Sequence, residues 1–167
     1  MEGHPSLTGA GMFKNVFQIA YVTNDLGRAV SLFRSEQGVA ELAIFDDFTL
    51  DVEGGGKAVI NVALGYVGDT QLEIIEPVSG EVELYRTWLP EEFAVRHHHF
   101  CHRLDSVAEL DAVRSRYEQA GYAIALDASL GETRLFYADT TKLLDHYQEY
   151  AWVDGQAEQF MATLPRN

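Results

Sequence analysis

Runs of β-branched and aromatic residues, separated by turn signals, dominate the pattern of the chain and predict mainly strands. The first half predicts strands at residues 16–22, 40–45, 58–67 and 70–76. Between the first two strands, apolar residues recur at helical spacing over 26–33, and Asn24 or Asp25 can cap that helix. Pro77 closes the last of these strands.

The second half repeats this order of elements. Strands are expected at residues 97–104, 122–126, 133–138 and 143–152. After the first of them, Ser106 and Glu109 form a capping box that begins a helix, and Gly121 ends it. Residues 78–95 break the pattern, connect the two halves and can hold one short helix.

Two successive series of strand, helix and three strands indicate an α+β fold made by internal duplication. One module is expected at residues 15–77 and the other at 96–152, within a single domain of residues 15–152. Residues 1–14 are polar and small and are expected to form a loose N-terminal arm. The C-terminal tail, residues 153–167, is expected to carry a short helix without visible chemistry.

The chain has 167 residues, about the length of one domain, and its acidic charge narrows the classes of partner. Its 12 basic and 26 acidic residues give a net charge of −14, which repels phosphate backbones. No apolar run approaches the roughly 20 residues that span a bilayer, and the first residues do not resemble a signal peptide. Cys101, the single cysteine, excludes a disulfide framework. We therefore expect a cytoplasmic protein that binds neither nucleic acid nor membrane.

Four polar residues lie in the middle of apolar strands, where a solvated side chain is not expected. They occupy the first and fourth strands of each half and are Gln18, Glu73, His99 and Glu149. One imidazole, two carboxylates and one amide oxygen can form the first shell of a divalent ion and leave positions for water or substrate. Structural roles compete with this reading: a backbone hydrogen bond for Gln18, an arginine partner for Glu73 and a water-facing strand for Glu149. Any histidine of the run 97–99 can be the ligand.

The segments that carry these residues are similar to the vicinal oxygen chelate superfamily, which includes glyoxalase I, methylmalonyl-CoA epimerase, extradiol dioxygenases and antibiotic-resistance proteins. They are FQIAYVTNDLGRAVSLF, TQLEIIEP, HHHFCHRLDSVAELDAV and YQEYAW, and they span residues 16–152. The resemblance implies two β-α-β-β-β modules whose mixed sheet forms a cleft-like barrel around one metal ion, with the helices outside. It also implies ligands on the first and fourth strands of each module, which are Gln18, Glu73, His99 and Glu149 in this chain.

Residues two apart on a strand share a face, so neighbours of the implied ligands are candidates for the substrate cleft. These candidates are Gln71, His97, Cys101 and Tyr147. An inert buried thiol and a packed aromatic ring are the ordinary roles of Cys101 and Tyr147. His98 and His102 alternate to the opposite face and are expected in structural roles.

Two departures from the family pattern bear on activity. The ligand set is like that of the eukaryotic type of glyoxalase I, but ADTTKLLDHYQEY replaces the Asp-Pro-Asp-Gly turn of that enzyme. The second base of the epimerases is expected on the third strand, where the sequence offers only Asn61. Because an amide takes no proton at neutral pH, this weighs against two-base epimerisation and leaves Asn61 as a cleft candidate.

The resemblance and the candidate residues predict a metal-dependent, glyoxalase-like isomerase or lyase that acts on a small carbonyl compound. The ion, zinc first and nickel, cobalt, manganese or iron as alternatives, would bind the substrate and stabilise an enolate, while Glu149 or Glu73 shuttles the proton. The alternatives are an acyl-CoA epimerase, a ring-cleaving dioxygenase and a metal-free small-molecule-binding protein of the same fold. A homodimer is expected, because the edge strands of each module need a partner.

Overall fold

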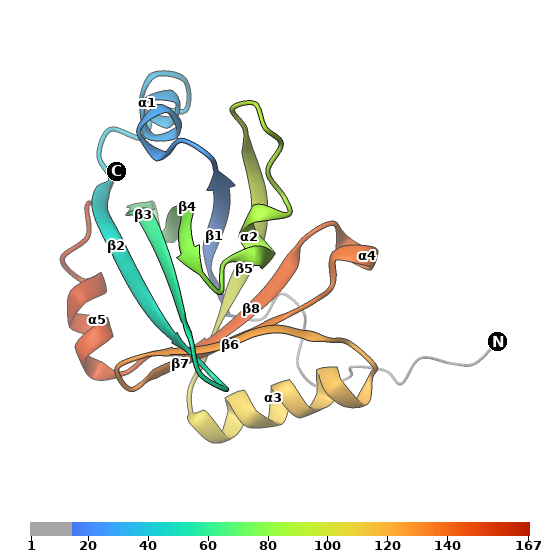
Figure 1. Cartoon of the computed structure of the whole chain (residues 1–167). Coiled ribbons are helices and arrows are strands. Elements are labelled where there is room, and N and C mark those ends of the chain that lie inside the picture. The colour runs from blue at the N-terminus through green and yellow to red at the C-terminus, as the bar shows by residue number, and fades with distance from the viewer. Residues whose placement is uncertain (1–14) are drawn as a thin grey trace.

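The computed structural model describes residues 15–167, and the N-terminal arm expected at residues 1–14 lies outside the described residues. The described part contains eight strands and five helices (Figure 1). The strands are β1 (Val16–Thr23), β2 (Ala43–Val52), β3 (Lys57–Val67), β4 (Thr70–Gly80), β5 (Val95–Leu104), β6 (Ile124–Leu130), β7 (Thr133–Ala138) and β8 (Tyr147–Trp152). The helices are α1 (Leu26–Glu36), α2 (Glu83–Arg86), α3 (Val107–Gln119), α4 (Thr141–Leu144) and α5 (Gly155–Met161).

All eight strands form one closed barrel in the order β1-β4-β3-β2-β6-β7-β8-β5. Within each half, the first strand pairs parallel with the fourth, β1 with β4 and β5 with β8. Antiparallel pairing of β1 with β5 and of β2 with β6 joins the two halves. The predicted α+β fold, two β-α-β-β-β series that form a mixed, cleft-like barrel, is confirmed.

The two long helices lie outside the barrel, one over each half (Figure 1). α1 packs on β3 and β4, and α3 packs on β5, β6, β7 and β8. Asp25, rather than Asn24, caps α1, because its carboxylate accepts a hydrogen bond from the Arg28 amide. The Ser106 hydroxyl accepts from the Glu109 amide at the start of α3, as the capping box predicts. Within residues 15–167, no helix is long and apolar enough to cross a membrane.

Strand alternation sorts the apolar side chains into one interior core and two outer layers. Side chains such as Val22 and Ile60 fill the interior of the barrel. A second cluster that includes Ile74 lies under α1, and a third that includes Phe136 lies under α3. Full burial of one such side chain contributes roughly 1.5–3 kcal/mol, so the direction in which each strand faces is strongly determined. A polar residue at an inward position is therefore held inside the barrel.

Several element boundaries differ from the prediction, among them that of β6, which was expected at residues 122–126. Three of the differences have a local reason. β4 continues beyond Pro77, because this residue lies at a register shift against β3, where a missing amide is tolerated. β2 continues through Asp46 and Asp47, since a bulge with Asp47 at φ 51° interrupts the pairing there without ending the strand. The last strand begins at Tyr147, not at residue 143, because α4 occupies the preceding residues.

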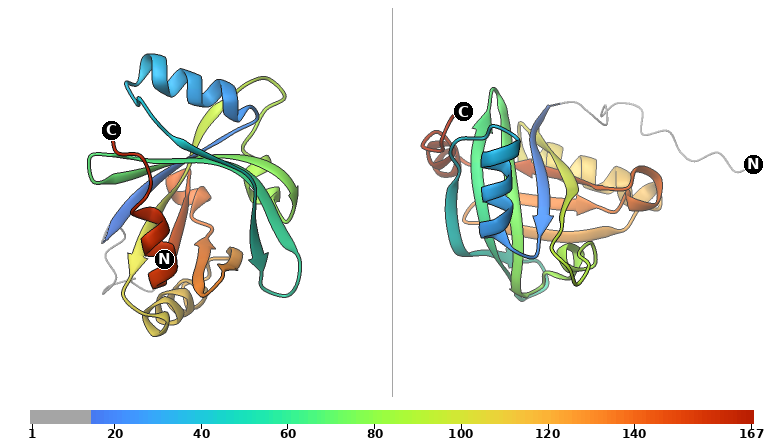
Figure 2. Two further views of the ribbon diagram at one scale, coloured as in Figure 1. Left: turned by 90° about the vertical axis from the view of Figure 1, so that its left-hand side faces the viewer. Right: turned by 90° about the horizontal axis from the view of Figure 1, so that it is seen from above.

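The C-terminal tail packs against the barrel. α5 lies across the side of the molecule that faces the viewer in the left panel of Figure 2. Phe160 in α5 stands edge-on to Phe45 in β2, with ring centroids 5.2 Å apart. At the end of the chain, the Asn167 side chain hydrogen-bonds the backbone of Glu41 and Tyr66. These contacts tie the end of the second half to the first half.

Candidate metal centre

Strand pairing brings Glu73 and His99 together across a small residue. Ala20 in β1 pairs with Glu73 in β4 on one side and with His99 in β5 on the other. Ala20 is fully buried, and its methyl group leaves the space above β1 to the two longer side chains. The sheet thereby joins a carboxylate of the first half to an imidazole of the second.

The next row of the sheet brings Gln18 and Glu149 to the same face. Gln18 pairs with Gln71 in β4 and with Cys101 in β5, and Cys101 pairs with Glu149 in β8. Because alternate strand residues share a face, this row lies beside that of Ala20. The four predicted ligands therefore come from four adjacent strands, two from each half.

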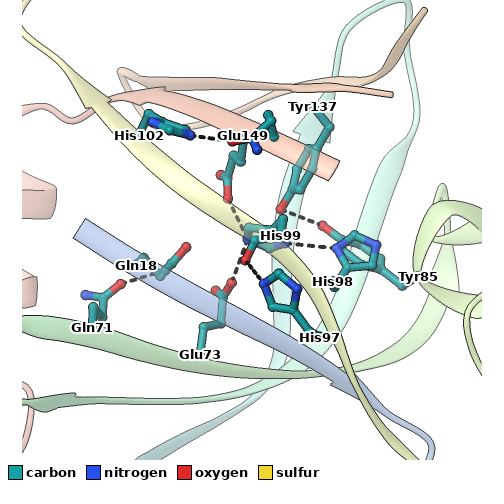
Figure 3. Close-up of polar contacts among 11 residues, drawn as sticks. Gln18, Gln71, Glu73, Tyr85, His97, His98, His99, His102, Tyr137 and Glu149 are labelled. Carbon is teal, nitrogen blue, oxygen red and sulfur yellow. Dashed lines mark hydrogen bonds and ion pairs between the residues drawn. The ribbon is translucent and has the colours of Figure 1, made fainter. Parts of the chain in front are cut away.

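Three of these side chains converge on one point inside the barrel (Figure 3). His99 Nε2 lies 2.8 Å from Oε2 of Glu149 and 3.4 Å from Oε2 of Glu73. The potential ligand atoms of the three residues all lie within 4.8 Å of one another. Despite this proximity, the buried Nε2 atom has no partner in hydrogen-bonding geometry among residues 15–167. A buried ring nitrogen and two carboxylates that meet at one point, with no hydrogen bond of good geometry between them, supply donor atoms suited to a cation.

A hydrogen-bond relay determines which nitrogen of His99 faces the carboxylates. His98 Nε2 lies 3.1 Å from the Leu84 carbonyl oxygen, which only accepts, so this nitrogen carries the proton of His98. Burial holds the pKa of His98 well below its ordinary value, and the ring is neutral. Its Nδ1 therefore accepts from His99 Nδ1, 2.9 Å away. When His99 is neutral, its Nε2 carries the lone pair that a metal ligand needs.

Burial and the neighbouring charges shift the pKa values of His99 and Glu73 in opposite directions. Burial by itself lowers the pKa of His99, but the Glu149 and Glu73 carboxylates outweigh it and raise the pKa to about 9. Burial raises the pKa of Glu73, against the lowering effect of His99. A proton on His99 thus compensates the carboxylates when no cation is bound, and a divalent ion can replace that proton.

Gln18 presents a fourth potential donor, an amide oxygen, on the same face. Its amide nitrogen donates to Gln71 Oε1 over 2.6 Å, and Gln71 in turn donates to the Tyr66 hydroxyl. Because its nitrogen is held in this way, Gln18 turns its amide oxygen toward the triad of Glu73, His99 and Glu149 (Figure 3).

The triad lies in the wall of a cavity inside the barrel, with about 760 Å³ of empty space including its open end. The polar residues of its lining are Gln18, Gln71, Glu73, Tyr85, Cys101, Thr133, Tyr137 and Glu149. The remaining walls are apolar, and α5 contributes Ala157, Phe160 and Met161 to them. Among the described residues that form the lining, none is lysine or arginine.

Of the other residues predicted for the cleft, some line the cavity and some do not. Gln71 and Cys101 line the cavity as expected from their faces. Tyr147 packs against His98 inside the barrel, but it is not part of the cavity lining. Asn61 lies on the outer face of β3, where its side-chain oxygen accepts a hydrogen bond from the Asp47 amide. Asn61 therefore does not reach the cleft.

The expectation for His97 and His98 is reversed by a β-bulge. β5 has one more residue than β1 between the pairs Ala20–His99 and Tyr21–His97, so the alternation of faces breaks at His98. His98 consequently lies inside, against His99, while His97 packs on Tyr21 outside. Three identical residues in a row give no sign of such a bulge.

Two tyrosines of the lining were also missed by sequence reasoning. Tyr85 belongs to α2 in the connection between the halves, and Tyr137 follows apolar residues in β7. Only the closure of the barrel brings both into one cavity, so no local pattern could identify them.

The donor set fits a divalent cation. Two carboxylates compensate its charge, and a neutral imidazole with its other nitrogen hydrogen-bonded is a usual ligand of zinc, nickel, cobalt, manganese and iron. The orphaned, fully buried Nε2 atom of His99 gives independent support, since a bound ion would provide its missing partner. The residues that would hold the ion are Glu73, His99 and Glu149, with Gln18 as a fourth ligand.

Comparison with known proteins agrees with this architecture. The sequence model of the glyoxalase/bleomycin resistance protein/dioxygenase superfamily matches residues 17–136. No curated protein matches the sequence at a significant level. A hypothetical protein from Bacillus halodurans has a similar structure, with a TM-score of 0.57 and 13% identity over 85% of this chain and 96% of its own.

Methylmalonyl-CoA epimerases are also similar in structure. The enzyme from Mycobacterium tuberculosis has a TM-score of 0.54 and 12% identity over 88% of this chain and 95% of its own. An epimerase in complex with methylmalonyl-CoA and NH4+ has a TM-score of 0.53 and 17% identity over 85% and 96% of the two chains. Identities this low show a shared fold alone. With a family match over most of its length, the chain belongs to the glyoxalase/bleomycin resistance protein/dioxygenase superfamily.

Proposed function

We propose that this protein is a divalent-metal-dependent isomerase or lyase that acts on a small, uncharged carbonyl compound. The observation that carries the proposal is the buried Nε2 of His99, which faces the carboxylates of Glu73 and Glu149 without a hydrogen bond. When bound, the ion supplies Lewis-acid polarisation of the substrate carbonyl. Zinc is the first candidate, with nickel, cobalt, manganese and iron as alternatives.

Two carboxylates in one cavity support a proton-transfer step in this proposal. Glu73 and Glu149 project from β4 and β8 toward the same point and both line the cavity. One can remove a proton from the carbon beside the carbonyl, and the carboxylic acid so formed can return it to a neighbouring atom, which completes an isomerisation.

The cavity walls support an uncharged substrate. A carboxylate or phosphate in this space would face Glu73 and Glu149, and the described lining offers no lysine or arginine to pair with it. The solved epimerases resemble the chain in fold, and one of them holds methylmalonyl-CoA. Because Asn61 lies outside the barrel and cannot act as a second base, an acyl-CoA epimerase is the less favoured alternative.

Proton exchange tests the proposal directly. Protein loaded with zinc, nickel, cobalt or manganese is incubated with hydroxyacetone in D2O, and deuterium uptake at carbon is followed by proton NMR. Glu73→Gln and Glu149→Gln should each slow uptake by about 100-fold or more, since general acid–base catalysis typically contributes that much. Glu76→Gln is the matched control, because Glu76 lies on β4 but binds the Leu26 amide. Equal uptake with all variants, or none above the rate of free metal, would favour the metal-free binding protein.

A further inference from the structure

Tyr137 carries a hydroxyl proton that no residue of the described structure accepts. The Tyr85 hydroxyl donates to the Tyr137 hydroxyl over 3.2 Å, so the oxygen of Tyr137 is already used as an acceptor. A phenol has one proton to donate in addition, and the hydrogen bonds found within residues 15–167 give it no acceptor. Buried donors are almost always paired, so the partner of this one is expected to be a ligand.

The unused proton is located beside the candidate metal centre. Tyr137 and Tyr85 are buried and both line the cavity. Tyr137 pairs with Glu149 across β7 and β8, and its ring stands edge-on to that of His99 with centroids 4.9 Å apart. Figure 3 shows the hydroxyl end of Tyr137 beside His99, with Tyr85 on its far side.

We propose that the Tyr137 hydroxyl donates a hydrogen bond to an oxygen atom of the bound substrate and that Tyr85 is the positioning residue that orients it. This rests on the proposed function, because it takes the ligand to be a small carbonyl compound in this cavity. By accepting from Tyr85, Tyr137 is restrained to direct its own proton away from α2 and toward the cavity. The donor comes from β7 and is therefore separate from the ligands on β1, β4, β5 and β8.

The chemistry of the step explains the choice of a neutral donor. When a carboxylate removes a proton from the carbon beside a carbonyl, negative charge develops on the carbonyl oxygen. A hydroxyl already held beside that oxygen stabilises the charge without having to reorient. The Tyr137 proton stays on its oxygen throughout, so the step is a hydrogen bond and not a proton transfer.

The same contact narrows the substrate class. A ketone or aldehyde oxygen accepts from one hydroxyl, and its apolar substituent can pack against walls such as Leu64 and Phe160. A free carboxylate would need more donors than this wall supplies, beside the carboxylates of Glu73 and Glu149. The inferred ligand is an uncharged carbonyl compound with a small apolar substituent.

A second tyrosine pair in the same chain provides a matched control. The hydroxyls of Tyr117 and Tyr150 lie 2.9 Å apart, and both residues belong to the cluster under α3, outside the barrel. Tyr117→Phe therefore removes a buried phenol hydroxyl from an equivalent pair without touching the cavity. Any general effect of losing such a hydroxyl will appear in this variant.

The test measures binding of acetohydroxamic acid by isothermal titration calorimetry. This small probe with neighbouring oxygen atoms is uncharged in solution at neutral pH and binds zinc as its hydroxamate. It uses the full chain, both metal-free and loaded with zinc, as wild type, Tyr137→Phe, Tyr85→Phe and Tyr117→Phe. Tyr137→Phe should weaken probe binding about 10-fold, the usual effect of losing one hydrogen bond to a charged or strongly polar group. Tyr85→Phe should weaken it less, because Tyr137 keeps its proton but loses its orientation. Tyr117→Phe should bind the probe as wild type does.

Zinc affinity and thermal unfolding are measured on every variant. The proposal predicts unchanged zinc affinity in Tyr137→Phe. In this variant the Tyr85 hydroxyl loses its acceptor, and the double variant Tyr85→Phe/Tyr137→Phe controls for that loss. Equal probe binding by wild type and Tyr137→Phe, or no probe binding by wild type in either form, overturns the donor role. Failure of wild type to bind any metal overturns the proposed function instead. The donor role of Tyr137 is then decided by comparing probe binding of the metal-free wild type and Tyr137→Phe.

Discussion

At the scale of single residues, the site depends on one ring nitrogen and on the side chains that direct it. His99 Nε2 faces Glu73 and Glu149 because the Nδ1 atom is committed to His98. His98 in turn is anchored by the Leu84 carbonyl. Hydrogen-bond partners of this kind commonly change metal affinity by 10- to 100-fold, so His98 is as testable as the ligands themselves.

Replacing His98 should weaken the metal site without removing a ligand. We expect His98→Phe to lower zinc affinity about 10- to 100-fold, because His99 then loses the acceptor that selects its tautomer. Competition with a chromophoric chelator measures the change. His97→Phe is the control, since His97 lies outside the barrel. The zinc affinity of this variant should match that of wild type. Equal affinities of the two variants would contradict the relay.

The protonation of His99 predicts how metal binding depends on pH. The pKa of His99 is raised from its ordinary value to about 9, so at neutral pH an incoming cation must displace a proton. Zinc affinity should therefore rise about tenfold per pH unit from pH 6 to 8, with about one proton released per ion. Calorimetry in buffers of different ionisation enthalpy measures that release. In His99→Gln, the remaining affinity should lose this dependence.

The same shift has a stability counterpart in the metal-free protein. A folded-state pKa raised above the unfolded value stabilises the protein most below pH 6.5, and this contribution is lost as pH rises through about 9. We expect the metal-free protein to become less stable to urea between pH 6.5 and 9.5, and the zinc-loaded protein to resist that loss. A metal-free protein that gains stability over this interval would contradict the assignment.

At the scale of elements, the hairpin of β3 and β4 is what places Glu73 against β1. Glycine is required where β4 ends, because Gly80 has φ +77° and an added Cβ would lie 1.9 Å from the Lys57 carbonyl oxygen. The turn of the same hairpin is less demanding. Gly68 has φ +58°, but a Cβ there would meet open space.

The two glycines give a paired prediction. Gly80→Ala should lower the free energy of unfolding by about 3 kcal/mol or more, since backbone strain and overpacking combine. Gly68→Ala should cost only about 1–2 kcal/mol, the strain of a left-handed residue alone. Urea unfolding of the metal-free protein compares them. A cost for Gly80→Ala no greater than that for Gly68→Ala would mean that the close approach to Lys57 relaxes.

At the scale of the whole molecule, the candidate centre joins the two halves of the barrel. Glu73 and Gln18 come from the first half, and His99 and Glu149 come from the second. The C-terminal segment makes a second connection, because Asn167 binds the backbone near β2 and β3. A cation bound at the triad would add a further connection between the halves, beside the β1–β5 and β2–β6 pairings.

Metal binding should therefore raise the stability of the entire barrel. A ligand at 100 times its Kd stabilises the native state by about 2.7 kcal/mol. For a chain of this size that corresponds to a rise in Tm of roughly 5–10 °C. Differential scanning fluorimetry with zinc, nickel, cobalt and manganese tests this, with Glu149→Ala as the variant that should not respond. Absence of any shift in wild type would favour a metal-free binding protein.

The homodimer remains a prediction, but the reason first given for it does not apply to the closed barrel. A homodimer was expected because the edge strands of a module need a partner, but β1–β5 and β2–β6 pairing closes those edges within one chain. A dimer would have to use a face of the molecule. Light scattering should give twice the chain mass of 18.7 kDa, and a mass of 18.7 kDa at high protein concentration would reject the dimer.

Local patterns in the sequence predicted the order of the strands and of the two long helices, and they singled out most of the candidate ligands. Alternation predicted the inward faces of β1, β4 and β8, because a strand with one buried face cannot change register without exposing its apolar residues. That is why Gln18, Glu73 and Glu149 were identified as unusual positions. Resemblance to a family then supplied the closed arrangement that would bring these distant residues together.

Only the tertiary structure decided features that depend on pairing between strands. The bulge that turns His98 inward exists because β1 and β5 differ by one residue in their pairing, and no periodicity within His97–His99 reveals it. The family resemblance suggested Asn61 for the cleft, although alternation with the interior residues Ile60 and Val62 already puts Asn61 on the opposite face. Only the tertiary structure shows that α5 covers a cavity lined by strands of both halves. Tyr85 and Tyr137 meet for the same reason. Local sequence determines which way a side chain faces along its own strand, whereas barrel closure determines what it faces.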